Sequence, residues 1–239
     1  MQSNLWCMMV AMSSTTVLTF CATLASVGTG SAVLSELNAA SGTSFSFAAM
    51  IARFLAFLAL GVCGIYAARQ CDLRGSLIVT SEDRGRTVRD FMIYGVLPGF
   101  VLGVINYLLF FRHRYSPLVR PEIRNMETFY DSFLLSIDAA VGEEIIFRLF
   151  IVSALFFFLR QMYAKIFHLW PSLVSLLPVA LALVVSSLLF ALAHDIYGFT
   201  AAFWGGLVLG VIYVKGGIES AIAAHFVANF LFFSASYLS

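Results

Sequence analysis

Charged side chains are scarce in this sequence. Of its 239 residues only 11% are Asp, Glu, Lys or Arg, whereas 61% are hydrophobic. Soluble globular domains carry about 25% charged residues, so this composition excludes a soluble domain and predicts an integral membrane protein. The formal net charge of +1 also lacks the basic excess that nucleic-acid binding requires. We therefore expect no nucleic-acid partner.

The sequence also lacks cysteines at the spacings typical of disulfide frameworks or metal sites. Cys7, Cys21, Cys63 and Cys71 show neither CxxC nor Cys/His spacing, which argues against a disulfide framework and against a thiolate metal site. No Lys or Arg precedes the first apolar stretch, so we expect a retained membrane span there rather than a cleaved signal peptide. No repeat or shift in composition divides the chain, and we expect one integral membrane domain over residues 1–239.

Long apolar windows recur along the chain, and a helix needs about 20 apolar residues to cross the hydrocarbon core of a bilayer. In lipid, a spanning segment must satisfy its backbone hydrogen bonds internally, which selects helices over an open sheet. The pattern therefore predicts an all-α, polytopic bundle of transmembrane helices. The windows are residues 5–27, 45–68, 91–111, 171–193, 198–214 and 220–238.

Residues 128–162 differ from these windows because they are apolar in bulk but carry six charged residues. A single helix over this segment would be about 50 Å long, more than a bilayer needs. We therefore expect a break near Gly142, which gives seven spans, or eight if the piece before the break also crosses. The arginine-rich loops 69–90 and 112–127 flank the 91–111 span on opposite sides and leave the orientation undecided.

Three of those charges lie in the stretch Val141–Phe150, VGEEIIFRLF. Ionisable side chains inside membrane spans are costly and by default point to a functional site in the bundle interior. On a helix, Glu144 and Arg148 are four residues apart and share a face, so we expect an ion pair. Glu143 points about 100° away from them and is left to act on its own.

Two further motifs place polar groups in later spans. His194 ends the pattern Phe190-x-x-x-His194, and His225 stands four residues before Asn229. These groups cannot all face lipid, so we expect them to meet Glu143 in a wet cavity within the bundle. A carboxylate with a histidine can activate water, and a second histidine with a carboxamide can stabilise an oxyanion. No serine or cysteine nucleophile motif is present, which favours hydrolysis without a covalent intermediate.

Together these residues resemble the CPBP family of intramembrane glutamic endopeptidases, also called Abi, which includes CAAX prenyl proteases and bacteriocin-processing proteins. The family pattern is EExxxR, then FxxxH, then HxxxN/D, on different membrane helices. All three motifs occur here in that order, and the resemblance covers residues 128–235, the expected protease core.

The resemblance implies roles for six residues and no metal cofactor. It assigns Glu143 as the catalytic glutamate, with His194 helping to activate water. It places His225 and Asn229 at an oxyanion hole, and it gives Glu144 and Arg148 a supporting role in orienting the site.

We therefore predict a multi-pass protein of the cell membrane that hydrolyses a peptide bond in a membrane-associated protein or peptide, with that substrate and the lipid bilayer as its partners. The alternative is a non-enzymatic membrane protein, a proton-linked transporter or an immunity or scaffold protein, in which the same residues form a relay. A narrower variant keeps the hydrolase but makes His194 and His225 ligands of a catalytic metal. No feature of the sequence indicates an oligomeric state.

Overall fold

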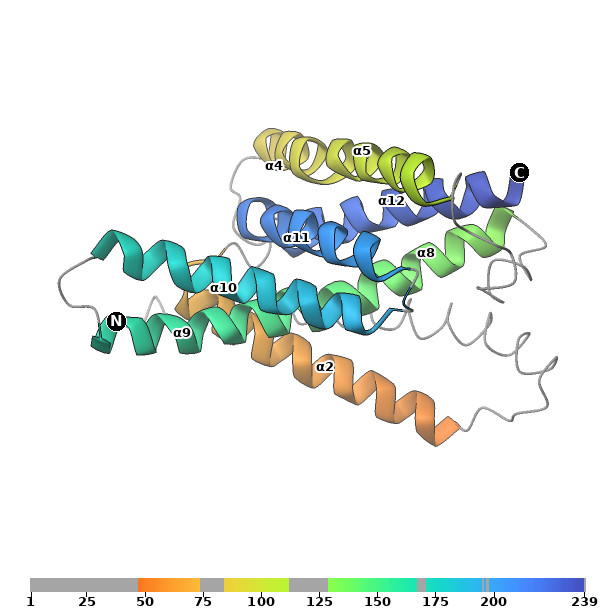
Figure 1. Ribbon diagram of the computed structural model, residues 1–239. Helices are drawn as coiled ribbons and strands as arrows, with labels where there is room; N and C mark the ends of the chain where they lie inside the picture. The colour runs from red at the N-terminus through yellow and green to blue at the C-terminus, as the bar shows by residue number, and fades with distance from the viewer. Residues whose placement is uncertain are drawn as a thin grey trace.

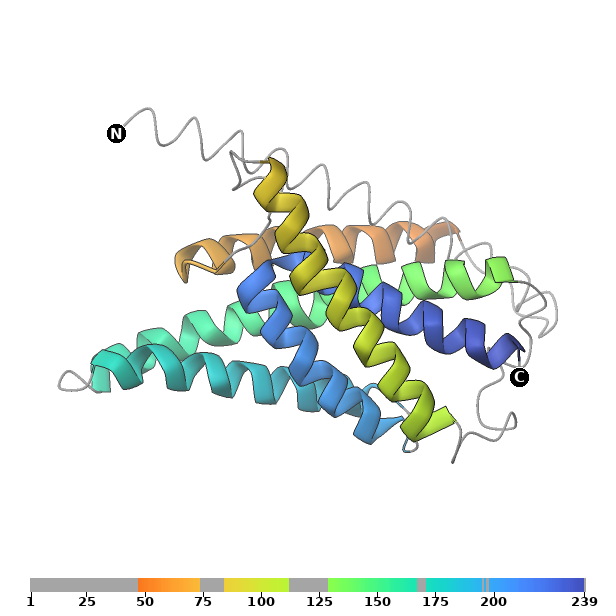
Figure 2. The ribbon, with the colours of Figure 1, turned by 90° about the horizontal axis from the view of Figure 1, so that it is seen from above.

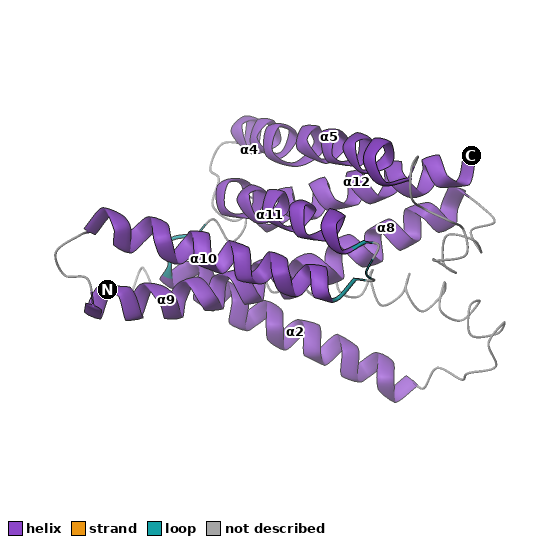
Figure 3. Ribbon diagram, in the orientation of Figure 1, coloured by secondary structure: helices purple, strands orange, loops and turns teal. Residues whose placement is uncertain are grey.

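The computed structural model describes residues 47–73, 84–111, 129–166, 171–194, 196 and 198–238. These residues are almost entirely helical, and they contain no strand (Figures 1 and 3). The predicted all-α fold is thus confirmed. In chain order the α-helices and the π-helical segments (η) are α2 (Phe47–Gln70), α4 (Arg84–Phe91), η1 (Met92–Val96), α5 (Leu97–Asn106), η2 (Tyr107–Phe111), α8 (Phe129–Glu144), η3 (Ile145–Val152), α9 (Ser153–Ile166), α10 (Pro171–Leu192), α11 (Phe199–Gly216) and α12 (Ile218–Leu238).

Several of these helices are long and apolar enough to span a membrane. Four meet that length and composition among the described residues: Val88–Leu109, Phe129–Tyr163, Phe199–Gly216 and Ile218–Ala235. Two shorter apolar helices, Phe54–Gln70 and Leu176–Leu192, accompany them. The expected span at 5–27 lies outside the described residues, and the total of seven or eight spans stays a prediction.

The expected break near Gly142 is wrong. Helix runs without interruption from Phe129 through α8, η3 and α9 to Ile166. The length of the segment did not require a break, because Phe129–Tyr163 forms one apolar helix of 35 residues. Its charges Glu144 and Arg148 are buried in the protein and paired with each other. Gly142 instead lets α2 approach, since a Cβ atom built on it would lie 3.3 Å from Cζ of Phe57.

Helix α12 is the element around which the described helices assemble. It packs against α5, α8 and α11, while α2 packs on η3 and α9, and α10 packs on α9 and α11. Seen from above, α4 and α5 cross over α11 and α12 (Figure 2). A tight turn joins α11 to α12 at Gly217, whose φ of 85° favours glycine and whose N–H donates to the Tyr213 carbonyl at 2.9 Å.

Small residues bring α5 against α12. Gly99 and Gly103 lie four apart on α5 and face Ala224 and Ala228, which also lie four apart on α12. A Cβ atom built on Gly99 would lie 2.5 Å from the Ala224 carbonyl oxygen, so the two backbones are almost in contact. Small residues at such spacing allow close packing of membrane helices. This contact fixes the rotation of α12 about its axis, and with it the direction of the neighbouring residues His225 and Asn229.

Gly99→Ala should therefore destabilise the protein. The added methyl group meets backbone atoms of Ala224, which cannot rotate away as a side chain does. We expect a loss of about 1–3 kcal/mol, the usual range for overpacking, measured as the melting temperature of the purified protein in detergent. Val101→Ile adds one methyl group to the exposed side of the same helix and should leave the melting temperature unchanged. Equal melting temperatures for Gly99→Ala and the wild type would refute the tight contact.

Candidate active site

The centre of the site is an ion pair inside the long helix. Glu144 ends α8 and Arg148 lies one turn later in η3, with Nε of Arg148 3.3 Å from Oε2 of Glu144. The two side chains are 0% and 1% exposed. The predicted pairing is thus present, and it lies in the protein interior, where removal of either charge leaves the other uncompensated. The pair occurs where α-helix gives way to π-helix, a change often found at functional sites.

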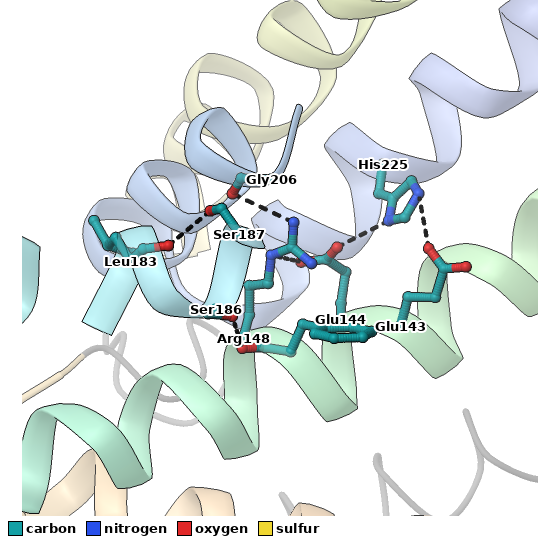
Figure 4. A network of polar contacts seen from close by, with 9 residues as sticks. Glu143, Glu144, Arg148, Leu183, Ser186, Ser187, Gly206 and His225 are labelled. Carbon is teal, nitrogen blue, oxygen red and sulfur yellow. Dashed lines mark hydrogen bonds and ion pairs between the residues drawn. The ribbon is translucent and has the colours of Figure 1, made fainter. Parts of the chain in front are cut away.

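Arg148 also contacts two other helices. Its Nη2 donates to the Gly206 carbonyl of α11 at 3.3 Å, and its Cζ lies 4.3 Å from the centre of the Phe190 ring of α10. A cation over an aromatic face is attracted by the ring quadrupole, and the attraction strengthens when water is excluded. Ser186 of α10 ties the same region by donating to the Phe147 carbonyl at 2.7 Å (Figure 4). Arg148 thereby connects η3 to α10 and α11.

His225 of α12 lies between the two glutamates (Figure 4). Its Nδ1 is 2.8 Å from Oε1 of Glu144, and its Nε2 is 3.6 Å from Oε2 of Glu143. Because the carboxylate of Glu144 is held by Arg148, Nδ1 of His225 is the donor in the shorter contact. The ring is thus oriented by Glu144, and its second nitrogen is directed at Glu143. The sequence pattern led us to expect His225 near Glu143, but it did not indicate the shorter contact of His225 with Glu144.

His194 follows directly on α10, which ends at Leu192. Its Nδ1 lies 2.8 Å from the Phe190 carbonyl oxygen, and its ring packs edge-on against the Phe190 ring at 4.6 Å. A carbonyl oxygen only accepts, so Nδ1 carries the hydrogen and a neutral ring keeps its lone pair on Nε2. The FxxxH spacing has a physical basis here, because Phe190 both supplies the carbonyl and holds the ring.

The predicted site residues meet at one cavity of about 320 Å³. Glu143 of α8, His194 beyond α10, and His225 and Asn229 of α12 all line it. The Glu143 side chain is 32% exposed, in contrast to the fully buried Glu144. Glu144 and Arg148 are not among the lining residues; Glu144 contacts His225, and Arg148 pairs with Glu144. The structure therefore separates the four predicted residues that line the cavity from the two that lie outside its lining.

Two further polar residues line the cavity and were not predicted. Asn106 comes from α5, and Asp138 comes from α8, five residues before Glu143. The signal was available, since a polar side chain in an apolar span is an indication of function in its own right. The Gly206 carbonyl could not have been found from the sequence, because any residue offers the same backbone acceptor.

The described residues form no cluster of metal ligands. Among the residues that the structure describes, no three His, Cys, Asp or Glu side chains are grouped closely enough to hold a metal ion. Cys63 and Cys71 are free thiols, and neither lines the cavity.

Comparison with known proteins relates part of the chain to a protease family. Residues 125–231 match the model of the Rce1-like type II CAAX prenyl endopeptidases. This segment, 107 of the 239 residues, is similar to the Rce1-like family. The sporulation-killing factor biosynthesis protein SkfC of Bacillus subtilis (strain 168) is 26% identical over 153 residues, in an alignment that covers 58% of this chain and 27% of SkfC. The chain thus aligns with about a quarter of that protein, and no solved structure matches significantly.

The match confirms the resemblance drawn from the three motifs. The Rce1-like family is a membrane-embedded protease family that acts on membrane-associated peptides, which supports a peptidase here. The matched segment contains Glu143, His194, His225 and Asn229. Asn106 precedes the matched segment, so part of the cavity wall comes from outside the Rce1-like segment.

Arg148→Met should strongly destabilise the protein, because it leaves Glu144 buried without its cation. We expect a loss of about 3–5 kcal/mol in unfolding free energy, measured in mixed micelles with increasing denaturing detergent. Adding Glu144→Gln to Arg148→Met should recover part of the loss, which a double-mutant cycle detects.

The matched control for this experiment is Arg160→Met. Arg160 lies on the same continuous helix and pairs at 3.5 Å with Asp72, but the two side chains are 44% and 88% exposed. Exposed ion pairs contribute little, so the loss should stay within about 1 kcal/mol. Equal losses for Arg148→Met and Arg160→Met would contradict a special role for the buried pair.

Proposed function

We propose that this protein is an intramembrane endopeptidase that hydrolyses a peptide bond of a membrane-associated protein or peptide with water activated by Glu143. The observation that carries the proposal is the convergence of Glu143, His194, His225 and Asn229 on one cavity. In this proposal, residues 128–235 form the protease core of a single membrane domain over 1–239.

Water activation falls to Glu143 and His194. Glu143 lines the cavity, whereas the carboxylate that Arg148 pairs with is the fully buried Glu144. It takes one proton from a water molecule while the water oxygen bonds to the carbonyl carbon of the substrate. His194 keeps a lone pair on Nε2 when its ring is neutral, and this atom accepts a hydrogen bond from the same water and orients it.

The oxyanion that forms on the substrate is stabilised by Asn229 and His225. The carboxamide N–H of Asn229 is one donor, and Nε2–H of a doubly protonated His225 is the other. With both glutamates ionised, Arg148 and this imidazolium bring the formal charge of the four side chains to zero. When Glu143 becomes protonated, the new oxyanion replaces its negative charge, so the cavity gains no net charge during the step.

Collapse of the tetrahedral intermediate completes the reaction. The oxyanion re-forms the carbonyl, the C–N bond breaks, and the proton held by Glu143 moves to the departing nitrogen. The products are a new carboxyl terminus and a new amino terminus, and Glu143 returns to its ionised form. No covalent bond to the protein forms at any stage.

Two substrate classes fit the relatives. The family name refers to prenylated CAAX sequences, and SkfC is described as a biosynthesis protein of a sporulation-killing factor. The proposal covers a membrane-associated segment of either kind. Comparison of protein termini in membranes that contain active and inactive forms would identify the class.

Glu143→Gln should abolish cleavage, because the amide keeps the shape of the side chain but cannot accept the proton. We expect at least a 100-fold loss of activity, within the usual range for removal of a general base. The measurement is mass spectrometry of membrane-protein termini from cells that express either form. Asp131→Asn makes the same acid-to-amide change on α8 away from the cavity and should leave the termini as in the wild type.

Identical termini for Glu143→Gln and the wild type would refute the glutamate mechanism. Proton-dependent uptake in vesicles, retained by Glu143→Asp, would instead favour a proton-linked transporter.

Chelators should leave the cleavage rate unchanged. In the proposed mechanism, Glu143 and His194 activate water directly, and no step uses a Lewis acid. The measurement compares the rate before and after treatment of the purified protein with 1,10-phenanthroline or EDTA, followed by metal analysis. Loss of activity that added Zn²⁺ restores would overturn the glutamate mechanism in favour of the metal-dependent variant.

A further inference from the structure

One wall of the cavity consists of small residues from a single helix. Gly198, Ala201, Ala202 and Gly205 line it from α11 or from the position just before it. Their spacing of three, four and seven residues puts them on one face of the helix. Leu209 continues the same face and also lines the cavity.

The glycines of α11 differ in what surrounds them. A Cβ atom built on Gly206 would lie 3.1 Å from Cβ of Ser187, and one built on Gly210 would lie 2.7 Å from Cδ2 of Leu183. Both therefore allow α10 to pack closely on α11. A Cβ atom built on Gly205 meets no atom of the described residues within 4 Å. Helix packing accounts for Gly206 and Gly210 but not for Gly205.

Glycine at position 205 destabilises the helix, and no packing contact of the described residues requires it there. Glycine weakens a helix interior relative to alanine, because its backbone loses more freedom on folding. Alanine would fit at 205 without any contact, so a purely structural helix would gain from it. The open space beside Gly205 belongs to the cavity that Glu143 and His225 also line.

This space lies close to the polar network. The next residue, Gly206, accepts a hydrogen bond from Arg148, which pairs with Glu144, which in turn contacts His225. The cavity wall around Gly205 is apolar, with Ala202 one turn before it and Leu209 one turn after it on α11. A group that fills this space is therefore apolar and lies near the atoms that act on the peptide bond.

We propose that Gly205 is a specificity-determining residue whose missing side chain makes room for a bulky apolar side chain of the substrate beside the scissile bond. This inference rests on the proposed endopeptidase function. It assigns the substrate class as a membrane-associated peptide with a large aliphatic or aromatic residue next to the cleaved bond. Gly205 does not take part in the chemistry itself.

The test is a graded series, Gly205→Ala, Gly205→Val and Gly205→Leu, in protein reconstituted into liposomes. The probes are internally quenched apolar peptides that carry Ala, Leu or Phe at each position in turn. Wild-type protein should favour Leu or Phe at one position beside the cleaved bond. Gly205→Leu should reduce cleavage of those peptides at least tenfold and reverse the preference toward Ala, because one or two methylene groups in an apolar pocket give discrimination of this size.

Val208→Leu is the matched control, because it enlarges a side chain on the exposed face of the same helix. It should leave the preference unchanged. Gly205→Ala should have a melting temperature equal to or above that of the wild type, a result that a packing role for Gly205 does not predict. A lowered melting temperature for Gly205→Ala would overturn the inference.

The failures of the inference and of the proposed function are distinguishable. If Glu143→Gln abolishes cleavage but Gly205→Leu keeps the wild-type preference, the inference is wrong and the function stands. If wild-type protein and Glu143→Gln give the same peptide cleavage and the same membrane-protein termini, both the inference and the proposed function are wrong.

Discussion

The buried contact of Glu144 with Arg148 and His225 determines how the rest of the bundle is arranged. Charges in an apolar interior are tolerated only when they are paired and hydrogen-bonded. Arg148 meets this condition through Glu144, the Gly206 carbonyl and the Phe190 ring, which draws α10 and α11 to η3. His225 extends the contact to α12 at 2.8 Å. Helices far apart in the sequence are thus held in one geometry by one paired set of buried charges.

This arrangement explains why two adjacent glutamates have different surroundings. Glu144 and Glu143 point in different directions from the helix, so one is fully buried and the other is 32% exposed at the cavity. His225 contacts both and couples the structural carboxylate to the exposed one. A change at Glu144 or Arg148 therefore acts on Glu143 through the ring of His225, although neither residue lines the cavity.

Much of the site could be predicted from the sequence, because charged and polar side chains are rare in membrane spans and must find partners there. The pairing of Glu144 with Arg148 follows from helical spacing, and the convergence of His194, His225 and Asn229 with Glu143 follows from the cost of leaving polar groups in lipid. The continuity of the helix past Gly142 could not be predicted, because the bilayer thickness that argued for a break does not limit the length of a helix packed against other helices. The contact between His225 and Glu144 depends on how α12 lies against α8, which no local pattern encodes.

The shape of the cavity depends on packing that only the assembled helices reveal. Gly99, Gly206 and Gly205 are the same residue type, yet the first two lie against neighbouring backbones or side chains and the third faces open space. A glycine in an apolar helix is ordinarily attributed to close packing. Only the neighbours of each glycine show whether it allows close helix packing or leaves open space. The polar residues that line the cavity are thus readable from three motifs, whereas the open space beside Gly205 follows only from how the helices pack.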